Sequence, residues 1–397
     1  MSNKLFYSLA VCLLSVTLGF NVFKNSAGTI FDYSNPIYSF KLSSPSDQIG
    51  LASMLSFSVA RRLDSTYYAL KNIQSVFRTD KHIVVFDGET DYIERLCFFD
   101  LTTGKLDKEV QFPTKYYDDI ASVRSVVYDA KQKKFYALAS GRESILEYSS
   151  TGDLISELYI GMYGNKMVLL DDGTFLVESS LHEKGLSKGY RLVLFNQKGE
   201  IVDLYFPYQQ REGGLSIEDT GILSKFDSIV HYSWPLGDTI YTFTNRVFSP
   251  EIIIDFEKST IPYEKRSNPT LVTNNQFSEY SFVLSDFAAT DDYLIFSYLN
   301  AGIQKNFELI NKKTGSYLNA RAALNDEFKT LFNSGDVLGM DGKTIIVELT
   351  PERARSLLKK RKDDIRLIQK NVPDLYRAIF QATQDMNPTL LYFNLKP

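Results

Sequence analysis

The sequence has little cysteine, histidine or tryptophan, and this scarcity excludes several kinds of site. Its 397 residues include two Cys, three His and one Trp. Cys12 lies in an apolar N-terminal segment, so no disulfide is expected in the folded domain once that segment is removed. His82, His182 and His231 are scattered, and with Cys97 alone they lack the ligand spacing of a structural zinc site. We therefore expect no metal and no cofactor, and we interpret Cys97 as a small buried hydrophobe.

The chain also lacks an excess of positive charge. It has 44 Lys and Arg against 48 Asp and Glu, a formal net charge of −4. Because no positive field gathers phosphates, nucleic acid is not expected as a partner. The Gly213-Gly214 pair is not followed by the Lys-Ser/Thr of a phosphate-binding loop, and no Gly-x-Ser-x-Gly nucleophile elbow occurs.

Long apolar runs are missing except at the N-terminus. Leu5 to Phe20 is an uncharged run of 16 residues that follows Lys4. This run is shorter than the roughly 20 residues that cross a bilayer comfortably. We predict that residues 1–28 are a signal peptide or a membrane anchor, that the protein is exported to the periplasm or cell envelope, and that it meets the membrane only through this segment.

Aromatic residues are abundant, and a glycine turn recurs among them. The 25 Tyr and 28 Phe favour β-sheets, where flat side chains pack across strands. Gly104, Gly152, Gly199 and Gly315 each close a polar turn after a strand-like stretch, at intervals of 48, 47 and 116 residues. Glycine takes the positive φ that such turns need. We interpret 254–259 as a degenerate copy within the longest interval. Repeats of this length, built from short strands, are typical of propeller blades.

Apolar runs around these turns divide residues 29–397 into six sets of strands. The prediction is an all-β fold, a six-bladed β-propeller, in which blade 4 begins with an inner strand at 228–233. Thr350, Pro351 and Glu352 mark the start of a helical insertion in the last blade, about 351–382. That blade then lacks an outer strand. Residues 54–61 are expected to supply it by pairing with the C-terminal strand, which closes the ring.

Three segments carry a resemblance to a known family. They are Asp238–Tyr241, Ser249–Phe256 and Asp385–Lys396. On these segments the chain resembles the exported six-bladed β-propeller proteins of Gram-negative bacteria, a group with TolB-like propeller relatives, over roughly residues 40 to 397. The resemblance implies the fold and export, and it implies no catalytic residues.

Four residues are candidates for a ligand site. In a propeller the inner strands line the channel, and residues near their ends can meet on one ligand. Arg124 stands near the start of the inner strand of blade 2, and His231, Tyr232 and Trp234 stand at the corresponding part of blade 4. A fixed charge beside amphipathic rings suits a polar, anionic or sugar-like ligand. The alternative is that Arg124 pairs with an acid in the channel and Trp234 fills a gap between blades.

A group of basic residues lies in the helical insertion. We interpret it as the solvated face of a helix opposite an apolar stripe, and the alternative is an anion-binding or membrane-binding patch. The residues are Arg353, Arg355, Lys359, Lys360, Arg361, Lys362, Arg366 and Lys370.

These observations favour a non-catalytic binding or scaffolding propeller outside the cytoplasm, monomeric, with a protein or glycan ligand. The alternative is a metal-dependent hydrolase or lactonase-like enzyme. Three or more acid or amide oxygens converging in the channel would favour that enzyme, and an aromatic lining would favour binding. Paired acids such as Asp171-Asp172 are interpreted as turn residues rather than a catalytic dyad.

Overall fold

The computed structural model describes most of the predicted propeller. The described residues are 38–41, 54–64, 66, 69–88, 94–113, 123–179, 189–207, 222–226, 228–234, 237–256, 259–262, 280–300, 304–313, 317–319, 328, 331–332 and 337–396. The predicted signal peptide or anchor at residues 1–28 lies outside them. Among the described residues, no helix is long and apolar enough to cross a membrane.

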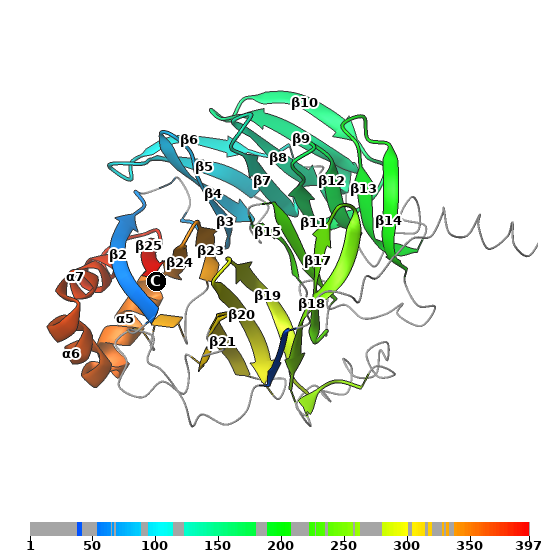
Figure 1. The fold of residues 1–397 in the computed structure, drawn as a ribbon. Coiled ribbons are helices and arrows are strands. Elements are labelled where there is room, and N and C mark those ends of the chain that lie inside the picture. Colours follow the sequence, from blue (N-terminus) through cyan, green and yellow to red (C-terminus); the bar gives the residue numbers. More distant parts are fainter. Residues whose placement is uncertain are drawn as a thin grey trace, which may run out of the picture.

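Six separate sheets form the molecule, and they confirm the predicted six-bladed β-propeller (Figure 1). Each blade contains four antiparallel strands, which we number a to d from the channel outward. Blade 1 holds β3 (Ile73–Arg78), β4 (His82–Gly88), β5 (Glu94–Asp100) and β6 (Leu106–Gln111). Blade 2 holds β7 (Ser125–Asp129), β8 (Lys134–Ala139), β9 (Ser144–Ser149) and β10 (Leu154–Tyr159), and blade 3 holds β11 (Gly164–Leu169), β12 (Phe175–Ser179), β13 (Tyr190–Phe195) and β14 (Ile201–Pro207).

Blades 4 to 6 complete the ring. Blade 4 holds β15 (Ile222–Phe226), β16 (Ile229–Ser233), β17 (Thr239–Thr244) and β18 (Val247–Asp255), and blade 5 holds β19 (Phe282–Ala289), β20 (Tyr293–Asn300), β21 (Gln304–Asn311) and β22 (Tyr317–Asn319). Blade 6 holds β23 (Val337–Asp341), β24 (Thr344–Leu349), β25 (Thr389–Leu395) and β2 (Leu55–Arg62). The inner strands β3, β7, β11, β15, β19 and β23 contact one another in that order, and β23 contacts β3.

The hydrophobic core consists of layers between neighbouring blades. Alternate side chains of a strand leave opposite faces of its sheet, so a blade with neighbours on both sides buries both faces. The run Ile83–Phe86 shows this: Val84 and Phe86 pack toward blade 2, whereas Ile83 and Val85 pack toward blade 6. Corresponding clusters fill the interfaces between the other blades. This two-sided burial explains why the strands read as continuous apolar runs.

Three of the four recurring turns lie where the sequence pattern places them, between strands c and d, and the turn at Gly315 lies outside the described residues. Gly104, Gly152 and Gly199 have φ of 71°, 78° and 79°. At Gly199 a Cβ would also come within 2.2 Å of the Tyr159 carbonyl oxygen on blade 2. Glycine is therefore required there both by the positive φ and by this close approach. Asp100 Oδ1 accepts the backbone N–H of Thr103 at 2.7 Å, the expected side-chain bond back onto the turn.

Blade 4 differs from the sequence prediction. Its inner strand is β15, so 228–233 covers the second strand, β16, rather than the first. Only two residues separate β15 from β16, and the pattern of β15 does not alternate cleanly. The supposed degenerate turn at 254–259 includes the end of β18, and the hairpin turn of this blade lies at Asn245 and Arg246, with φ of 50° and 64°.

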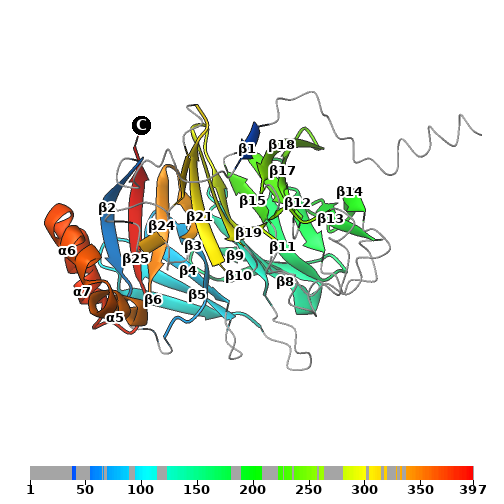
Figure 2. The same cartoon turned by 90° about the horizontal axis from the view of Figure 1, so that it is seen from below.

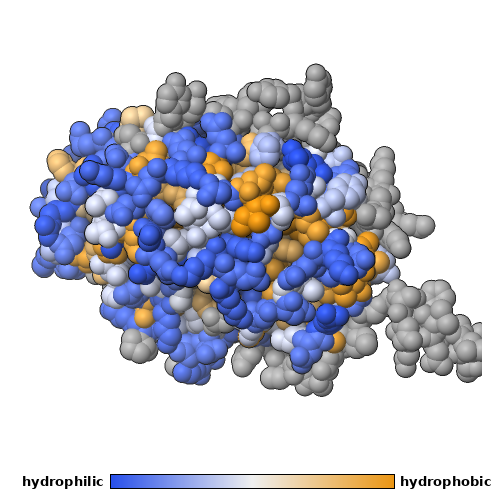
Figure 3. All heavy atoms as spheres, turned by 90° about the horizontal axis from the view of Figure 1, so that it is seen from above, coloured by the Kyte–Doolittle hydropathy of each residue, from blue (hydrophilic) through white to orange (hydrophobic). Residues whose placement is uncertain are grey.

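Blade 4 also has a fifth strand that the sequence did not reveal. The short strand β1 (Tyr38–Lys41) pairs in parallel with β18, from Tyr38 opposite Ile252 to Lys41 opposite Asp255. By contrast, the outer strand β10 of blade 2 is largely solvent-exposed and carries Leu154, Ile155 and Tyr159 at the surface. Figure 3, which looks onto this edge, shows a hydrophobic patch within a mainly hydrophilic surface.

Three helices separate β24 from β25 within the last blade: α5 (Pro351–Lys360), α6 (Lys362–Asn371) and α7 (Pro373–Ala382). Thr350 caps α5 as predicted, because its side chain accepts the N–H of Arg353 at 3.3 Å. The first helix ends at Arg361, where the backbone has φ −121° and ψ 50° and the chain turns into α6. This turn lets α6 pack against α5 and α7, and it brings Ile365 and Ile368 into the same apolar cluster as blade 6.

The ring closes by the predicted pairing of the two ends of the propeller. Strand β2 lies antiparallel to β25, from Leu55 opposite Leu395 to Arg62 opposite Thr389. Side chains from the segment before β25 reinforce the closure. Arg62 donates to Asp385, and the buried Asn387 accepts the N–H of Leu70 at 2.9 Å and donates to the Asp64 carbonyl. Figure 2 shows β2 and β25 side by side, with the helices at the opposite end of the blade from the C-terminus.

Candidate binding face

The two axial faces of the propeller are built differently. On one face, strand a connects to b and strand c to d, through links of no more than five residues such as 130–133 and 196–200. On the other face, which we call the loop face, strand b connects to c and each blade connects to the next. These links include 208–221, 256–281, 320–336 and the whole helical insertion. Long connections on a rigid scaffold are where binding residues concentrate.

Arg124 lies on the loop face, immediately before β7. Its backbone N–H donates to the Leu138 carbonyl at 3.0 Å, which fixes the start of the inner strand. The residue is half-buried, and its side chain has no hydrogen bond or ion pair with any described residue. The guanidinium, which is always charged, therefore stands near the channel without an acid among the described residues to neutralise it.

Trp234 also lies on the loop face, at the end of β16. The Arg191 guanidinium carbon, from the start of β13 on blade 3, lies 5.2 Å from the centre of the indole ring. The rings of Phe206 and Trp234 pack edge to face, with their centres 5.8 Å apart and their planes at 85°. The Nε1 atom of Trp234 is buried and has no hydrogen-bond partner among the described residues. An unsatisfied buried donor costs about 1–3 kcal/mol, so an orphaned indole N–H needs a physical explanation.

Phe206 adds backbone strain beside this indole. It is fully buried at the end of β14 and has φ of 55°, in the left-handed region that a bulky residue rarely adopts. Its ring contacts Tyr232, Tyr241 and Phe248 of blade 4 as well as Trp234. Strain of this kind tends to gather at functional sites. We refer to Arg191, Phe206 and Trp234 as the indole site.

His231 and Tyr232 occupy the interior of blade 4 and leave β16 on opposite faces. Tyr232 is fully buried toward blade 3, with its ring centre 4.9 Å from that of Phe206. His231 is buried toward blade 5, with its ring 4.9 Å from that of Phe287. Both side chains pack between blades, and neither presents a surface on the loop face.

His231 belongs to a charged group that joins blades 4 and 5. Its Nε2 lies 3.5 Å from Glu251 Oε2 on β18, and Lys312 Nζ of blade 5 lies 3.7 Å from Glu251 Oε1. Burial raises the pKa of Glu251, but the neighbouring His231 and Lys312 outweigh burial and hold this pKa below its ordinary value. The ionised carboxylate therefore links the two blades.

The structure places two of the four residues predicted from the sequence on the loop face, but on blades that are not adjacent. Arg124 and Trp234 share the loop face, on blades 2 and 4 with blade 3 between them, whereas His231 and Tyr232 lie in the interblade layers. Sequence reasoning missed Arg191 and Phe206. No local signal could have found them, because a contact between blades joins residues far apart in the chain.

The described residues offer neither a metal-binding cluster nor a reactive thiol. They contain no group of three or more His, Cys, Asp or Glu side chains that could hold a metal ion. Cys97 is buried, and burial raises the pKa of its thiol to about 12. A thiol with that pKa is not a nucleophile near neutral pH.

The family model DUF4934, a domain of unknown function, matches residues 66–394. The chain belongs to this family. The match includes strands of all six blades and the helical insertion, and it begins after β2. A comparison with curated proteins finds no match.

Solved structures share the fold. A "Putative exported protein" from Bacteroides fragilis NCTC 9343 superposes with a TM-score of 0.71 at 16% sequence identity, over 91% of this chain and 100% of that one. A member of the DUF4221 family from Bacteroides vulgatus gives 0.48 at 8% identity, over 86% and 97%. A virginiamycin B lyase from Staphylococcus aureus gives 0.40 at 12%, over 66% and 73%. At these identities the first likeness shows the fold alone, and the other two carry no argument.

Proposed function

We propose that the protein is a non-catalytic binding or scaffolding propeller outside the cytoplasm, and that it holds a polar, sugar-like or anionic ligand on its loop face. The unpartnered indole N–H of Trp234 carries this proposal. A ligand oxygen that accepted this hydrogen bond would satisfy the donor, and because Nε1 is buried, the atoms that cover it must shift to admit the ligand. Arg124, unpaired among the described residues, supplies a positive charge on the same face.

Aromatic rings suit a sugar-like ligand because they stack on the apolar faces of a pyranose while polar groups bind its hydroxyls. The indole site offers such a combination, since Trp234 is half-buried and held by Arg191 and Phe206. Location outside the cytoplasm is supported by the apolar run Leu5 to Phe20 and by a structural relative that is named as exported. A monomer with a protein or glycan partner fits this proposal.

Titration with defined probes tests the proposal. Oligomers of galacturonic acid, oligomers of N-acetylglucosamine and CaCl2 are titrated separately into the full chain, followed by calorimetry and thermal unfolding. A probe at 100 times its Kd raises the unfolding free energy by about 2.7 kcal/mol. We expect one of the sugars to bind, and Trp234→Phe to weaken it roughly tenfold by removing one hydrogen-bond donor.

Tyr159→Phe is the matched control, because it removes one polar hydrogen from an exposed ring on the outer edge of blade 2. Sugar binding that survives both Trp234→Phe and Arg124→Ala would place the ligand elsewhere. Binding of CaCl2 alone would support the metal-dependent hydrolase or lactonase-like alternative.

A further inference from the structure

The charge of the protein is unevenly distributed. The segment from Pro351 to Ala382, which forms α5, α6 and α7, holds nine basic and four acidic residues, a net charge of +5. The remainder of the chain holds 35 basic and 44 acidic residues, a net charge of −9. The helices form the outermost layer beside β2, as Figures 1 and 2 show. One side of an acidic protein is therefore strongly basic.

Lysines carry four of the five surplus positive charges, and Arg353 carries the fifth. Every acidic residue of the layer already pairs with an arginine three positions away: Glu352 with Arg355, Asp363 with Arg366, Asp364 with Arg361, and Asp374 with Arg377. Arg353 donates to backbone carbonyl groups. The exposed lysines left over have no hydrogen bond or ion pair with a described residue. They are Lys359, Lys360, Lys362 and Lys370, which we call the lysine group.

We propose that the lysine group docks the helical layer on an anionic phospholipid surface. A lysine ammonium is a compact, hydrated point charge without the fork geometry of arginine, so it suits a diffuse layer of anionic headgroups better than one shaped carboxylate or phosphate site. Two large apolar side chains are exposed in the same region, Phe380 at 54% and Met386 at 57%. Basic residues accompanied by exposed apolar ones are typical of surfaces that rest on a membrane interface.

Such docking adds a second membrane contact to the one predicted at the N-terminus. A group of four lysines binds a membrane weakly and reversibly, and stable attachment requires a second membrane-binding element. If the apolar run Leu5 to Phe20 is retained in a bilayer, the helical layer is tethered near that bilayer at high effective concentration. The lysine group would then fix the orientation of the propeller relative to the membrane.

Vesicle flotation of the full chain tests the proposal. Partitioning is compared between vesicles of phosphatidylcholine and vesicles with 30 mol% phosphatidylglycerol, in about 100 mM NaCl. Any contribution of the N-terminal run is common to both lipids, so the preference for the anionic vesicles is the readout. We expect a clear preference, and we expect the variant with all four lysines of the group changed to Gln to lose it on the order of 100-fold.

The matched control removes the same charge from the opposite axial face. Lys81, Lys105, Lys131 and Lys198 are exposed in turns between strands a and b or c and d, and their change to Gln should leave the preference nearly intact. Raising NaCl to about 500 mM should release the wild-type protein. This salt titration needs no variant and keeps the test valid if the quadruple variant does not fold.

The proposal would be overturned by equal partitioning into both kinds of vesicle, by an equal loss in the control variant, or by wild-type binding that does not respond to salt. Binding of soluble polyglutamate without preference for the anionic vesicles would also overturn it, because it would identify an acidic protein as the partner. Phe380→Ser, which leaves the charge unchanged, should weaken binding to the anionic vesicles severalfold if that ring enters the interface.

Discussion

At the scale of the single residue, Cys97 is enclosed between blades 1 and 6. It is fully buried with Val85, Phe99 and Leu390, which agrees with its interpretation as a buried hydrophobe. Burial disfavours the thiolate and raises the pKa to about 12, although the nearby Arg95 opposes this effect. The fraction of thiolate at pH 8 is therefore about one in ten thousand.

We predict that Cys97 resists thiol reagents in the native protein. In the Cys12→Ser variant, reaction with Ellman's reagent at pH 8 should be negligible over an hour. After unfolding in guanidinium, one thiol should react within minutes, and peptide mass spectrometry should locate it at Cys97. Rapid labelling of the native protein would contradict the burial of this side chain.

Glu251 gives the stability of the protein a specific dependence on pH. Its folded pKa lies below the ordinary value of 4.5, because His231 and Lys312 outweigh the effect of burial. The ionised carboxylate therefore stabilises the fold above about pH 4.5, and this contribution is lost as the pH falls through the folded pKa. We expect Glu251→Gln to lower the unfolding free energy by about 1–3 kcal/mol at pH 7.

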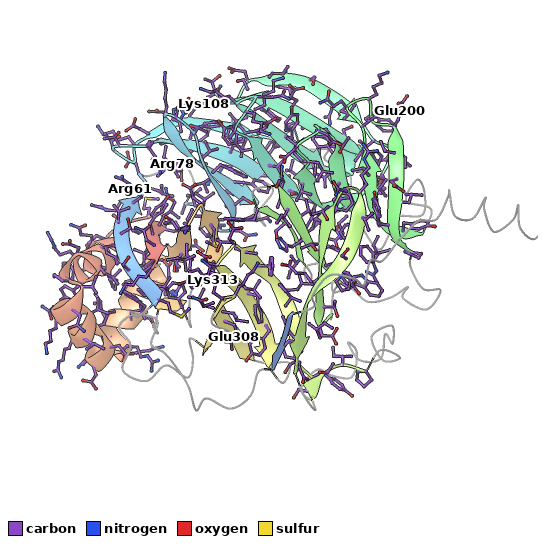
Figure 4. All side chains as sticks on the ribbon, viewed as in Figure 1. Arg61, Arg78, Lys108, Glu200, Glu308 and Lys313 are labelled. Atoms are coloured by element: carbon purple, nitrogen blue, oxygen red, sulfur yellow. The ribbon has the colours of Figure 1, made fainter. Side chains whose placement is uncertain are left out.

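Urea denaturation at pH 7, 5 and 3 checks this expectation. The difference between wild type and Glu251→Gln should shrink toward pH 3. Glu200→Gln is the control, because Glu200 lies in a turn on the outer rim of the ring (Figure 4). This substitution removes the same charge but leaves the ion pairs between blades 4 and 5 in place. A difference at Glu251 that stays constant with pH would show that its charge does not link the blades.

At the scale of the element, closure of the ring depends on a side chain as well as on strand pairing. Asn387 is buried in the segment before β25, where it bonds the backbone of Asp64 and Leu70. Asn387→Ala leaves the Leu70 N–H and the Asp64 carbonyl without this partner in a buried place, which costs about 2–4 kcal/mol in total. Urea unfolding measures the loss.

Asn394→Ala is the comparison for Asn387. Asn394 lies on β25 in the same blade and is exposed, and its side chain accepts a surface hydrogen bond from Thr344. We expect it to change the unfolding free energy by less than about 0.5 kcal/mol. If the two variants lose a similar unfolding free energy, the hydrogen bonds of Asn387 do not specifically stabilise the closure of the ring.

Removing the closing strand tests the same element more severely. Deletion of residues 29–65 takes away β2 and exposes the edge of β25, together with Leu391 and Phe393 of the cluster that also holds the helices. We expect the shortened chain to lose cooperative thermal unfolding by calorimetry. A shortened chain that melts in one sharp transition at the wild-type temperature would rule out this role of β2.

At the scale of the whole molecule, the prediction concerns export. The apolar run Leu5 to Phe20 after Lys4 predicts passage across the inner membrane. We expect fractionation of cells that express the full chain to place it in the periplasm or envelope, and mass spectrometry to find an N-terminus near residue 28 or an intact anchor. An intact chain in the cytoplasmic fraction would contradict export.

The local pattern of the sequence predicted the architecture because propeller blades are made from local contacts. Each hairpin is formed by neighbouring strands, and turn glycines such as Gly104 and Gly199 mark the connections, since few other residues adopt their positive φ. The helix cap at Thr350 also follows from local residue types. The closing strand pairs Leu55 with Leu395 at the other end of the chain, and it was found only because the strand count left the last blade one strand short.

Tertiary structure decided what lies between blades. The two-residue link before β16 concealed β15, so His231 and Tyr232 seemed to stand on an inner strand, although β16 is the second strand and buries both. A shift by one strand changes which surfaces a side chain meets, and no periodicity in the sequence records it. The contact of Arg191 with Trp234 and the group around Glu251 likewise join different blades. The sequence by itself therefore determined the repeated unit and the number of blades, because these depend on neighbours in the chain, and it determined the closure because the strand count left the last blade without an outer strand. Only the assembled ring decided which polar and aromatic groups meet on the loop face, because that depends on how one sheet packs against the next.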